Sequence, residues 1–478
     1  MTLAFALLLA ALFAAPLFAH RRGRASARAP IDLLAPARVT AVFHLVTIVP
    51  YLLLVALDES VVDPLVRQNA DVGELQPAIA WYALVQAVGF LALLAGTRSR
   101  RAARLAGRLP VIATDARPQR ERLAIACALA ISGIGFAVFV AQVGGLDFLL
   151  RNLDRRTALT AGAGYVLSLL NLLFFAIAIA IVGMRRRRTA LKWAFLGALV
   201  LAAAIVFSSL GGRKATLLIF VSGVFAWHYG VRPIRRVRFR HLLPAVALVP
   251  YFVIMPILRS PGGFEYFSRN PGALATEIAE NITVAVTDLS YVDTYLYVTN
   301  AFHAHDVWWG ATYRDLLKAP VPSTLDDSKP PLDDGVYVRT LAGGMRAEPG
   351  MAFKQLFYSS WPPETLGATY MNFWLPGVVV GMWLLGAVYR LAYAYMRRSR
   401  CTLYSIVVYA HVVVSFHLSN LRIVQAVVYL TITTLFFGLL FGFRARRRRV
   451  VRVPRLAPVA RLAPSGPPSA AGLAGARG

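Results

Sequence analysis

Long apolar stretches separated by short charged connections dominate this sequence. A helix that crosses the hydrocarbon core of a bilayer needs roughly 20 mostly apolar residues. The pattern predicts about eleven such spans, at residues 2–19, 39–57, 78–96, 123–143, 165–184, 193–210, 215–230, 242–258, 373–393, 401–417 and 423–443. We therefore expect an all-α polytopic membrane protein in which residues 1–449 form one transmembrane helical domain.

The connections between these spans alternate in charge. One set carries runs of arginine, at 21–38, 98–122, 185–192, 232–240, 397–400 and 444–449. The other set contains the acidic loop 58–77 and the long segment 259–372, in which acidic residues outnumber basic ones. Because cytoplasmic loops carry an excess of Lys and Arg, this predicts the N-terminus outside and the C-terminus inside. Segment 259–372 becomes one large external loop, and 450–478 a disordered cytoplasmic tail.

Composition agrees with a membrane protein and argues against a nucleic-acid binder. Hydrophobic residues make up 58% of the 478, and the net charge of +28 falls largely in the short arginine runs. Charge in that position sets topology, so no nucleic-acid partner is expected. The two cysteines, Cys127 and Cys401, both lie in predicted spans and suggest neither a disulfide framework nor a metal site.

The first span has two interpretations. Its Ala-rich end resembles a cleavable signal peptide, but it lacks a basic segment before the apolar stretch, and Arg21 and Arg22 follow it directly. A retained anchor that starts outside is the interpretation that we adopt.

Positive charge also occurs on the predicted outer face, where the topology rule disfavours it. The turn Gly211–Lys214 places Arg213 and Lys214 there. These side chains either snorkel to lipid headgroups or form a fixed site for an anionic headgroup, and the turn alone does not separate the two.

Other predicted outer arginines lie in a short interfacial helix near 146–153 and at the ends of later spans. They are Arg151, Arg155, Arg156, Arg259 and Arg422. Several guanidinium groups on one face predict a site for a polyanion such as a phosphate.

Four stretches, "GGRKATLLI", "GGLDFLLRNLDRR", "WWGATYRDLLKAPVPSTLDDSKPP" and "SSWPPETLGATYMNFWLPGVVVGMWLLG", together resemble the oligosaccharide repeat-unit polymerases of the O-antigen polymerase type. The resemblance covers roughly residues 130–445. Of the family's glycine, tyrosine and Pro-rich loop residues, the chain keeps Gly310, Tyr313, Pro322, Lys329 and Pro330. The chain departs from that pattern at Ser323, where Arg is usual, and at Asp326-Asp327, where Trp-Pro is common.

The resemblance implies a membrane glycosyltransferase in the bacterial cytoplasmic membrane. It would polymerise polyprenyl-pyrophosphate-linked oligosaccharide, at the outer face, into surface polysaccharide. A lipid-linked donor already carries its leaving group, so no cofactor or metal is expected, and no nucleotide-binding motif occurs. Membrane lipid, a flippase and a chain-length regulator are the further partners that this implies.

Two chemical roles follow from that reaction. Arginines would neutralise the charge that develops on the pyrophosphate, and a base would activate the acceptor hydroxyl. The substrate-binding candidates are Arg155, Arg156, Arg213, Lys214, Arg259, Arg422 and Lys329. The candidates for the base are His303, His305, Asp293 and Glu364. Each of these four also has a purely structural interpretation; for the two histidines it is that of hydrated side chains in an external loop.

Three alternatives stay open. A glycan ligase of the same architecture would transfer a finished glycan. A glycosyltransferase that uses polyprenyl-monophosphate sugars would need an acidic pair in the first outer loop, such as Asp58-Glu59. A flippase would move the lipid-linked oligosaccharide without chemistry, but the sequence has no internal repeat, and few charges lie at the span centres.

Overall fold

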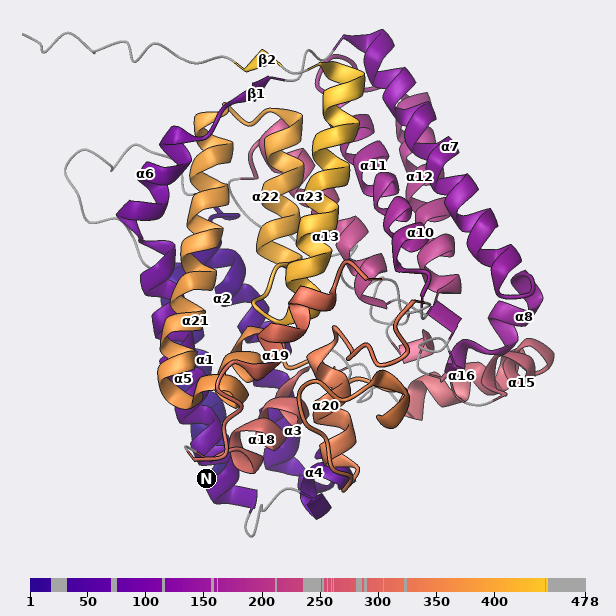
Figure 1. Ribbon diagram of the computed structural model, residues 1–478. Helices are drawn as coiled ribbons and strands as arrows, with labels where there is room; N and C mark the ends of the chain where they lie inside the picture. The colour runs from indigo at the N-terminus through magenta and orange to yellow at the C-terminus, as the bar shows by residue number, and fades with distance from the viewer. Residues whose placement is uncertain are drawn as a thin grey trace, which may run out of the picture.

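The computed structural model describes residues 1–18, 32–69, 75–113, 117–155, 159–160, 162–210, 213–234, 251, 253–255, 257–258, 260, 262–280, 286–287, 290–303, 305–321, 325–442 and 444–445. This part of the chain is a bundle of helices (Figure 1). Its only paired strands are β1 (Ile112–Ala113) and β2 (Arg444–Ala445), which are antiparallel. The predicted all-α fold is confirmed for the described residues.

Within the described residues, seven helical segments are long and apolar enough to cross a bilayer by length and composition. They are Pro36–Leu57 (helices α2, Pro36–Thr47, and α3, Val49–Leu57), α5 (Leu75–Thr97), α7 (Pro118–Gln142), Gly164–Gly183 (containing α10, Gly164–Ser168, and α11, Leu172–Gly183), α12 (Ala190–Ser209), α21 (Glu364–Arg398) and α23 (Asn420–Phe441). Three shorter apolar helices accompany them. They are α1 (Thr2–Phe18), Thr216–Gly230 within α13 (Arg213–Gly230), and α22 (Leu403–Ser415).

These helices overlap the predicted spans except at 242–258, most of which lies outside the described residues. The total of about eleven spans therefore stays a prediction. The remaining helices are short. They are α4 (Pro64–Asn69), α6 (Arg100–Arg108), α8 (Leu146–Arg151), α15 (Gly263–Arg269), α16 (Pro271–Glu280), α18 (Val292–Ala301), α19 (Ala311–Arg314) and α20 (Asp334–Ala342).

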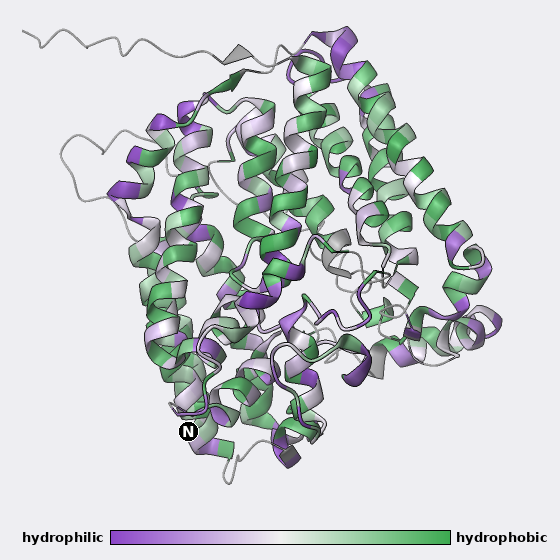
Figure 2. Ribbon diagram, in the orientation of Figure 1, coloured by the Kyte–Doolittle hydropathy of each residue, from purple (hydrophilic) through white to green (hydrophobic). Residues whose placement is uncertain are grey.

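Connections of opposite charge lie at opposite ends of the bundle. The basic helix α6 and the strand pair β1–β2 are at the top of Figure 1, whereas α4, α18 and α20 are at the bottom. This agrees with the predicted separation of basic and acidic connections. Hydrophilic residues gather toward the two ends, and apolar residues cover the bundle between them (Figure 2).

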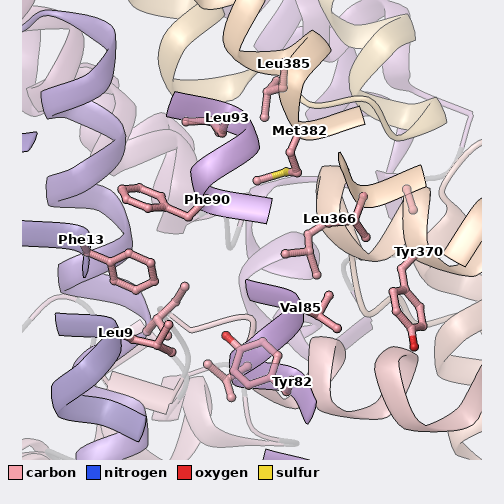
Figure 3. Packing of buried hydrophobic residues seen from close by; sticks show 14 of the residues in the cluster. Leu9, Phe13, Tyr82, Val85, Phe90, Leu93, Leu366, Tyr370, Met382 and Leu385 are labelled. Carbon is pink, nitrogen blue, oxygen red and sulfur yellow. The ribbon is translucent and has the colours of Figure 1, made fainter. Parts of the chain in front are cut away.

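Helices α5 and α21 form the closest contact in the core. A Cβ atom on Gly96 would lie 2.1 Å from the carbonyl oxygen of Trp383, and one on Gly386 would lie 2.1 Å from that of Leu93. Such small residues let two membrane helices approach backbone to backbone, where van der Waals packing is the main attraction. Around this crossing, side chains such as Phe90, Leu366 and Met382 fill the core (Figure 3).

Helix α21 contains a break that reverses the chain. Trp374 has φ 54° and ψ −147°, which is not helical, and it divides the helix into 364–373 and 375–398. A Cβ atom on Gly377 would lie 2.3 Å from the carbonyl oxygen of Thr369, and one on Gly381 would lie 2.4 Å from its Cγ2. In a straight helix, Thr369 and Gly381 would be about 18 Å apart. Segment 364–373 therefore folds back against the span that follows it.

This reversal makes 364–373 a re-entrant segment. A Cβ atom on Gly89, in the middle of α5, would lie 3.2 Å from both Leu366 and Val378. Leu366 is thus at the level of the middle of a span rather than beyond its end. Non-helical backbone such as that at Trp374 is tolerated at such depth only where protein buries it. The last part of the predicted external loop 259–372 is consequently a buried helix.

The close contact between α5 and α21 generates a stability prediction. Replacing Gly96 by Ala forces the two backbones apart and should lower the free energy of unfolding by roughly 1–3 kcal/mol. Thermal unfolding in detergent, followed by loss of helical signal, measures this. Gly197 is the matched control, because a Cβ there meets nothing within 4 Å. Gly197→Ala should leave stability unchanged or raise it by roughly 0.5–1 kcal/mol. Equal effects of the two substitutions would contradict the packing argument.

Candidate functional site

A buried ion pair lies where the re-entrant segment begins. Glu364, the first residue of α21, is 1% exposed. Its two carboxylate oxygens accept from Nη2 of Arg422 at 2.8 Å and from Nε at 3.2 Å. Arg422 is in the first turn of α23, and its side chain is 14% exposed. This two-point contact is the geometry in which guanidinium and carboxylate groups bind most strongly.

The backbone at Glu364 is itself unusual. Its φ is 47°, in the left-handed region that residues other than glycine seldom adopt, and Pro363 precedes it. A second left-handed residue, Trp374, ends the same segment. Strain of this kind persists only where the surrounding structure holds it, and it often accompanies functional sites. The re-entrant segment therefore begins and ends at residues whose strained backbone conformation the surrounding structure holds in place.

His417 completes the ionic group. Its Nε2 lies 3.7 Å from a carboxylate oxygen of Glu364, and its Nδ1 lies 3.3 Å from the hydroxyl of Thr365. The same hydroxyl accepts from the backbone N–H of Leu418 at 2.8 Å. Thr365 thus fixes the link 416–419 between α22 and α23 to the start of α21. Tyr389 donates to the carbonyl of Phe416 at 2.9 Å and secures the same link from the long part of α21.

The segment predicted to be an external loop reaches this link through Tyr313. Its hydroxyl donates to the carbonyl of Leu418 at 2.9 Å, and its ring is stacked on Phe373 with centroids 6.2 Å apart. A Cβ on Gly310 would lie 2.9 Å from the Phe373 ring, and Gly310 has φ 79°. Gly310 and Tyr313 belong to the loop pattern on which the predicted resemblance rests. Both therefore contact the elements that carry the ion pair.

An acidic pair on α20 borders the site. An oxygen of Asp334 accepts from the N–H of Asn420 at 3.0 Å, so it caps the helix that carries Arg422. The other oxygen is buried without a hydrogen-bond partner among the described residues. Burial raises the pKa of Asp334 to about 8, so it is protonated at neutral pH. Burial also raises the pKa of Asp333.

Asp293 lies on α18, which packs against the re-entrant segment. Tyr295, half a turn along α18, has its ring 3.6 Å from where a Cβ of Gly367 would be. The carboxylate of Asp293 accepts from the hydroxyl of Tyr51 and, at 3.2 Å, from the N–H of Asp63. Burial raises its pKa to about 6, although these hydrogen bonds act in the opposite direction.

The other candidates for the base lie elsewhere. His303 and His305 are exposed, with ring centroids 6.0 Å apart, and Nε2 of His305 is 3.2 Å from Asp306. No described contact joins either histidine to Glu364. Within the described ranges, His, Cys, Asp and Glu side chains form no group of three or more that would hold a metal ion.

Arg422 is the predicted substrate-binding residue that lies in the ion pair, and the other described candidates lie on other elements. Arg155 is exposed, near α8. Lys329 is half-buried and donates to the carbonyls of Ala319, at 3.3 Å, and Val321, so it closes a turn of the external segment. Arg213 and Lys214 begin α13, but their side chains are not described; Arg156 and Arg259 lie outside the described residues.

Neighbouring Arg151 lies on α8, which confirms the short helix predicted there. It pairs with Asp147 at 2.8 Å and lies 3.7 Å from Glu265. Its charge is therefore partly neutralised by local carboxylates.

Sequence reasoning missed His417 and the acidic pair Asp333-Asp334 as neighbours of Arg422. The stretch "DDSKPPLDDG", which contains the acidic pair, predicts a solvated turn, whereas the structure buries Asp334. His417 did carry a signal, since "SFHLSNLR" places it five residues before an arginine at the junction of two spans. A histidine at the junction of two spans is a candidate functional residue, because ionisable side chains among membrane spans are rare.

No protein-family model matches the chain, and no curated protein or solved structure shows significant similarity to it. The site must therefore be judged on its own geometry.

The ion pair generates a double-mutant prediction. Glu364→Gln alone leaves a buried guanidinium without its counter-charge, and should lower the free energy of unfolding by roughly 3–5 kcal/mol. Arg422→Gln alone leaves the buried carboxylate without its counter-charge and should lower the free energy of unfolding by a similar amount. The double variant carries two neutral amides, so its loss should be clearly smaller than the sum of the two single losses. Thermal unfolding in one detergent tests this, and strict additivity would show that the two groups do not interact.

Asp334 generates a prediction on pH. Its folded pKa of about 8 is above the ordinary value of 3.8, so the folded state holds the proton more tightly than the unfolded chain does. The contribution to stability is complete below pH 4 and is lost as pH rises toward 8. Asp334→Asn keeps an acceptor for Asn420 but does not titrate, so its melting temperature should fall less over that range. Asp327 is exposed, so Asp327→Asn is the control, and its melting temperature should change with pH as that of the wild type does. If the melting temperature of Asp334→Asn fell as steeply with pH as that of the wild type, the raised pKa of Asp334 would be refuted.

Proposed function

We propose that this protein is a membrane glycosyltransferase of the bacterial cytoplasmic membrane. It would join polyprenyl-pyrophosphate-linked oligosaccharide units into surface polysaccharide at the outer face. The observation that carries the proposal is the Glu364–Arg422 pair with His417, held by a re-entrant helix inside a bundle of mostly apolar helices. Ionisable groups among membrane spans are costly and are usually retained for function. The class of substrate comes from the sequence resemblance.

Arg422 is the residue that we assign to the pyrophosphate. Glu364 orients the guanidinium through two hydrogen bonds, and Gln425 accepts from Nη1 at 2.9 Å. A guanidinium fixed in advance stabilises developing negative charge without reorganising during the reaction. This changes the role of Glu364 from candidate base to positioning residue, since its carboxylate is engaged by Arg422. Predicted contributions of Arg155, Arg156, Arg213, Lys214, Arg259 and Lys329 remain part of the proposal.

Asp293 is the base that we favour. A carboxylate with a pKa of about 6 is ionised at neutral pH and still basic enough to accept a proton. In the proposed reaction, an acceptor hydroxyl of one unit attacks the anomeric carbon of another. The bond from that carbon to the pyrophosphate oxygen breaks, the pyrophosphate leaves on its lipid, and the hydroxyl proton passes to Asp293. No exchange of electrons with a cofactor is needed.

Replacement of Arg422 in the native host tests the proposal. Arg422→Lys keeps one positive charge but cannot make the two-point contact, so turnover should fall by roughly a hundredfold or more. On a gel the long-chain ladder of surface glycan should disappear, while single repeat units accumulate on lipid at the outer face. Asp293→Asn should give the same pattern. Arg232→Gln, at an exposed connection, is the control and should preserve the ladder, with protein levels in the membrane matched throughout.

The other outcomes identify the alternatives. Single units trapped on the inner face would indicate a flippase, and a finished polymer that stays on its lipid would indicate a ligase. An unchanged ladder in folded Arg422→Lys would mean that the ion pair has a structural role only, and the proposed chemistry would be wrong.

A further inference from the structure

Helix α6 presents a compact group of arginines on one face. Arg100, Arg101, Arg104 and Arg108 are all exposed, whereas Ala102 and Ala106 are buried. At 100° per residue, the four arginines fall within an arc of about 100° on the side opposite the two alanines. Three of them, Arg101, Arg104 and Arg108, follow the i, i+3 and i+7 spacing that aligns side chains along one stripe.

The face has a fixed place at the edge of the bundle. Helix α6 follows the apolar span α5 after a short break at Arg98-Ser99, and Ser99 caps its N-terminus. Nη1 of Arg398, at the end of α21, donates to the carbonyls of Ala106 at 2.8 Å and Leu109 at 3.2 Å. Figure 2 shows the hydrophilic face of α6 at the periphery, level with the ends of the apolar helices. Such a place in a bilayer is at the level of the lipid headgroups.

Nothing described in the protein neutralises this charge. The sequence from 98 to 113 contains no acidic residue. Among the described ion pairs, those of arginine involve Arg151, Arg186, Arg269, Arg346 and Arg422, and none involves α6. Exposed Leu105 and Leu109 flank the arginines, with 48% and 38% of their surfaces accessible. Apolar side chains beside uncompensated arginines suit an amphiphilic ligand better than a soluble polyanion.

We propose that the α6 arginine face, defined as Arg100, Arg101, Arg104 and Arg108, binds anionic phospholipid. The guanidinium groups would contact the headgroup phosphate, and Leu105 and Leu109 would contact the upper acyl chains. Juxtamembrane basic clusters are attracted to anionic leaflets, and the attraction grows with each arginine. This site is at the opposite end of the bundle from α18 and α20 (Figure 1), and it does not rest on the proposed glycosyltransferase activity.

Lipid titration of the full-length protein tests this proposal. Phosphatidylglycerol or phosphatidylcholine is added to the detergent-solubilised protein, and bound lipid is counted by native mass spectrometry. The wild type should bind phosphatidylglycerol more tightly, and the preference should weaken with rising salt. Arg101→Gln/Arg104→Gln/Arg108→Gln should weaken phosphatidylglycerol binding by up to roughly a hundredfold. Phosphatidylcholine binding should not change.

The control removes equal charge from other basic connections. Arg185→Gln/Arg187→Gln/Arg232→Gln replaces three exposed arginines outside α6 and should retain wild-type binding. Equal losses in the two triple variants would show that net charge, not α6, attracts the lipid and would overturn the proposal. Equal binding of phosphatidylglycerol and phosphatidylcholine by the wild type would also overturn the proposal. If the α6 triple variant does not fold, Arg104→Gln alone should weaken binding several-fold, and an unchanged affinity would be equally decisive.

Discussion

The two-point contact between Glu364 and Arg422 is the interaction on which the arrangement of this bundle depends. A charge taken out of water costs several kcal/mol even after relaxation, unless a partner and further hydrogen bonds compensate it. Here the carboxylate is 1% exposed and the guanidinium side chain 14%. Two elements 58 residues apart in sequence must therefore meet. The reversal at Trp374 brings the carboxylate inward, and the short helix α22 lets α23 begin at a depth where Arg422 can reach it.

The neighbours of the pair act mainly by fixing backbone. Thr365, Tyr313 and Tyr389 each bond to the link 416–419, and Asp334 caps the helix that follows it. Three helices, α19, α20 and α21, thus hold this connection and the start of α23, which positions Arg422 more firmly than its own helix could. This explains why Gly310 and Tyr313, far from α21 in sequence, belong to the same unit. A site built in this way is pre-organised, which is the property that electrostatic catalysis requires.

Much of the architecture could be predicted from the sequence, because the period and length of apolar stretches determine which segments cross a bilayer. Helices α5, α7 and α12 begin and end within a few residues of the predicted spans. The reversal at Trp374 could not be predicted in this way. Residues 364–398 are apolar almost throughout, and a break within an apolar run leaves hydropathy unchanged. Pro376 was the local signal, but proline near the start of a helix is ordinary.

The sequence could identify individual residues of the candidate site, but not which of them contact each other. Glu364 and Arg422 were each singled out, the first as a base and the second as a phosphate ligand. The contact between them depends on the tertiary fold, which neither segment determines alone. Asp293 was a candidate among several, and only its partial burial against Tyr51 and the N–H of Asp63 separates it from exposed His303 and His305.

Pairing also limits what Arg422 can contribute. The Glu364–Arg422 pair is neutral as a unit, so its long-range attraction for a pyrophosphate is small. The guanidinium can still direct N–H groups at a phosphate oxygen at short range, but charge balance in a dry site needs further cations. His417 lies against the same carboxylate and supplies one when it is protonated. In the proposed reaction the remaining charge would come from the predicted outer arginines, and the pair would orient Arg422 within a larger basic site rather than act as a complete clamp.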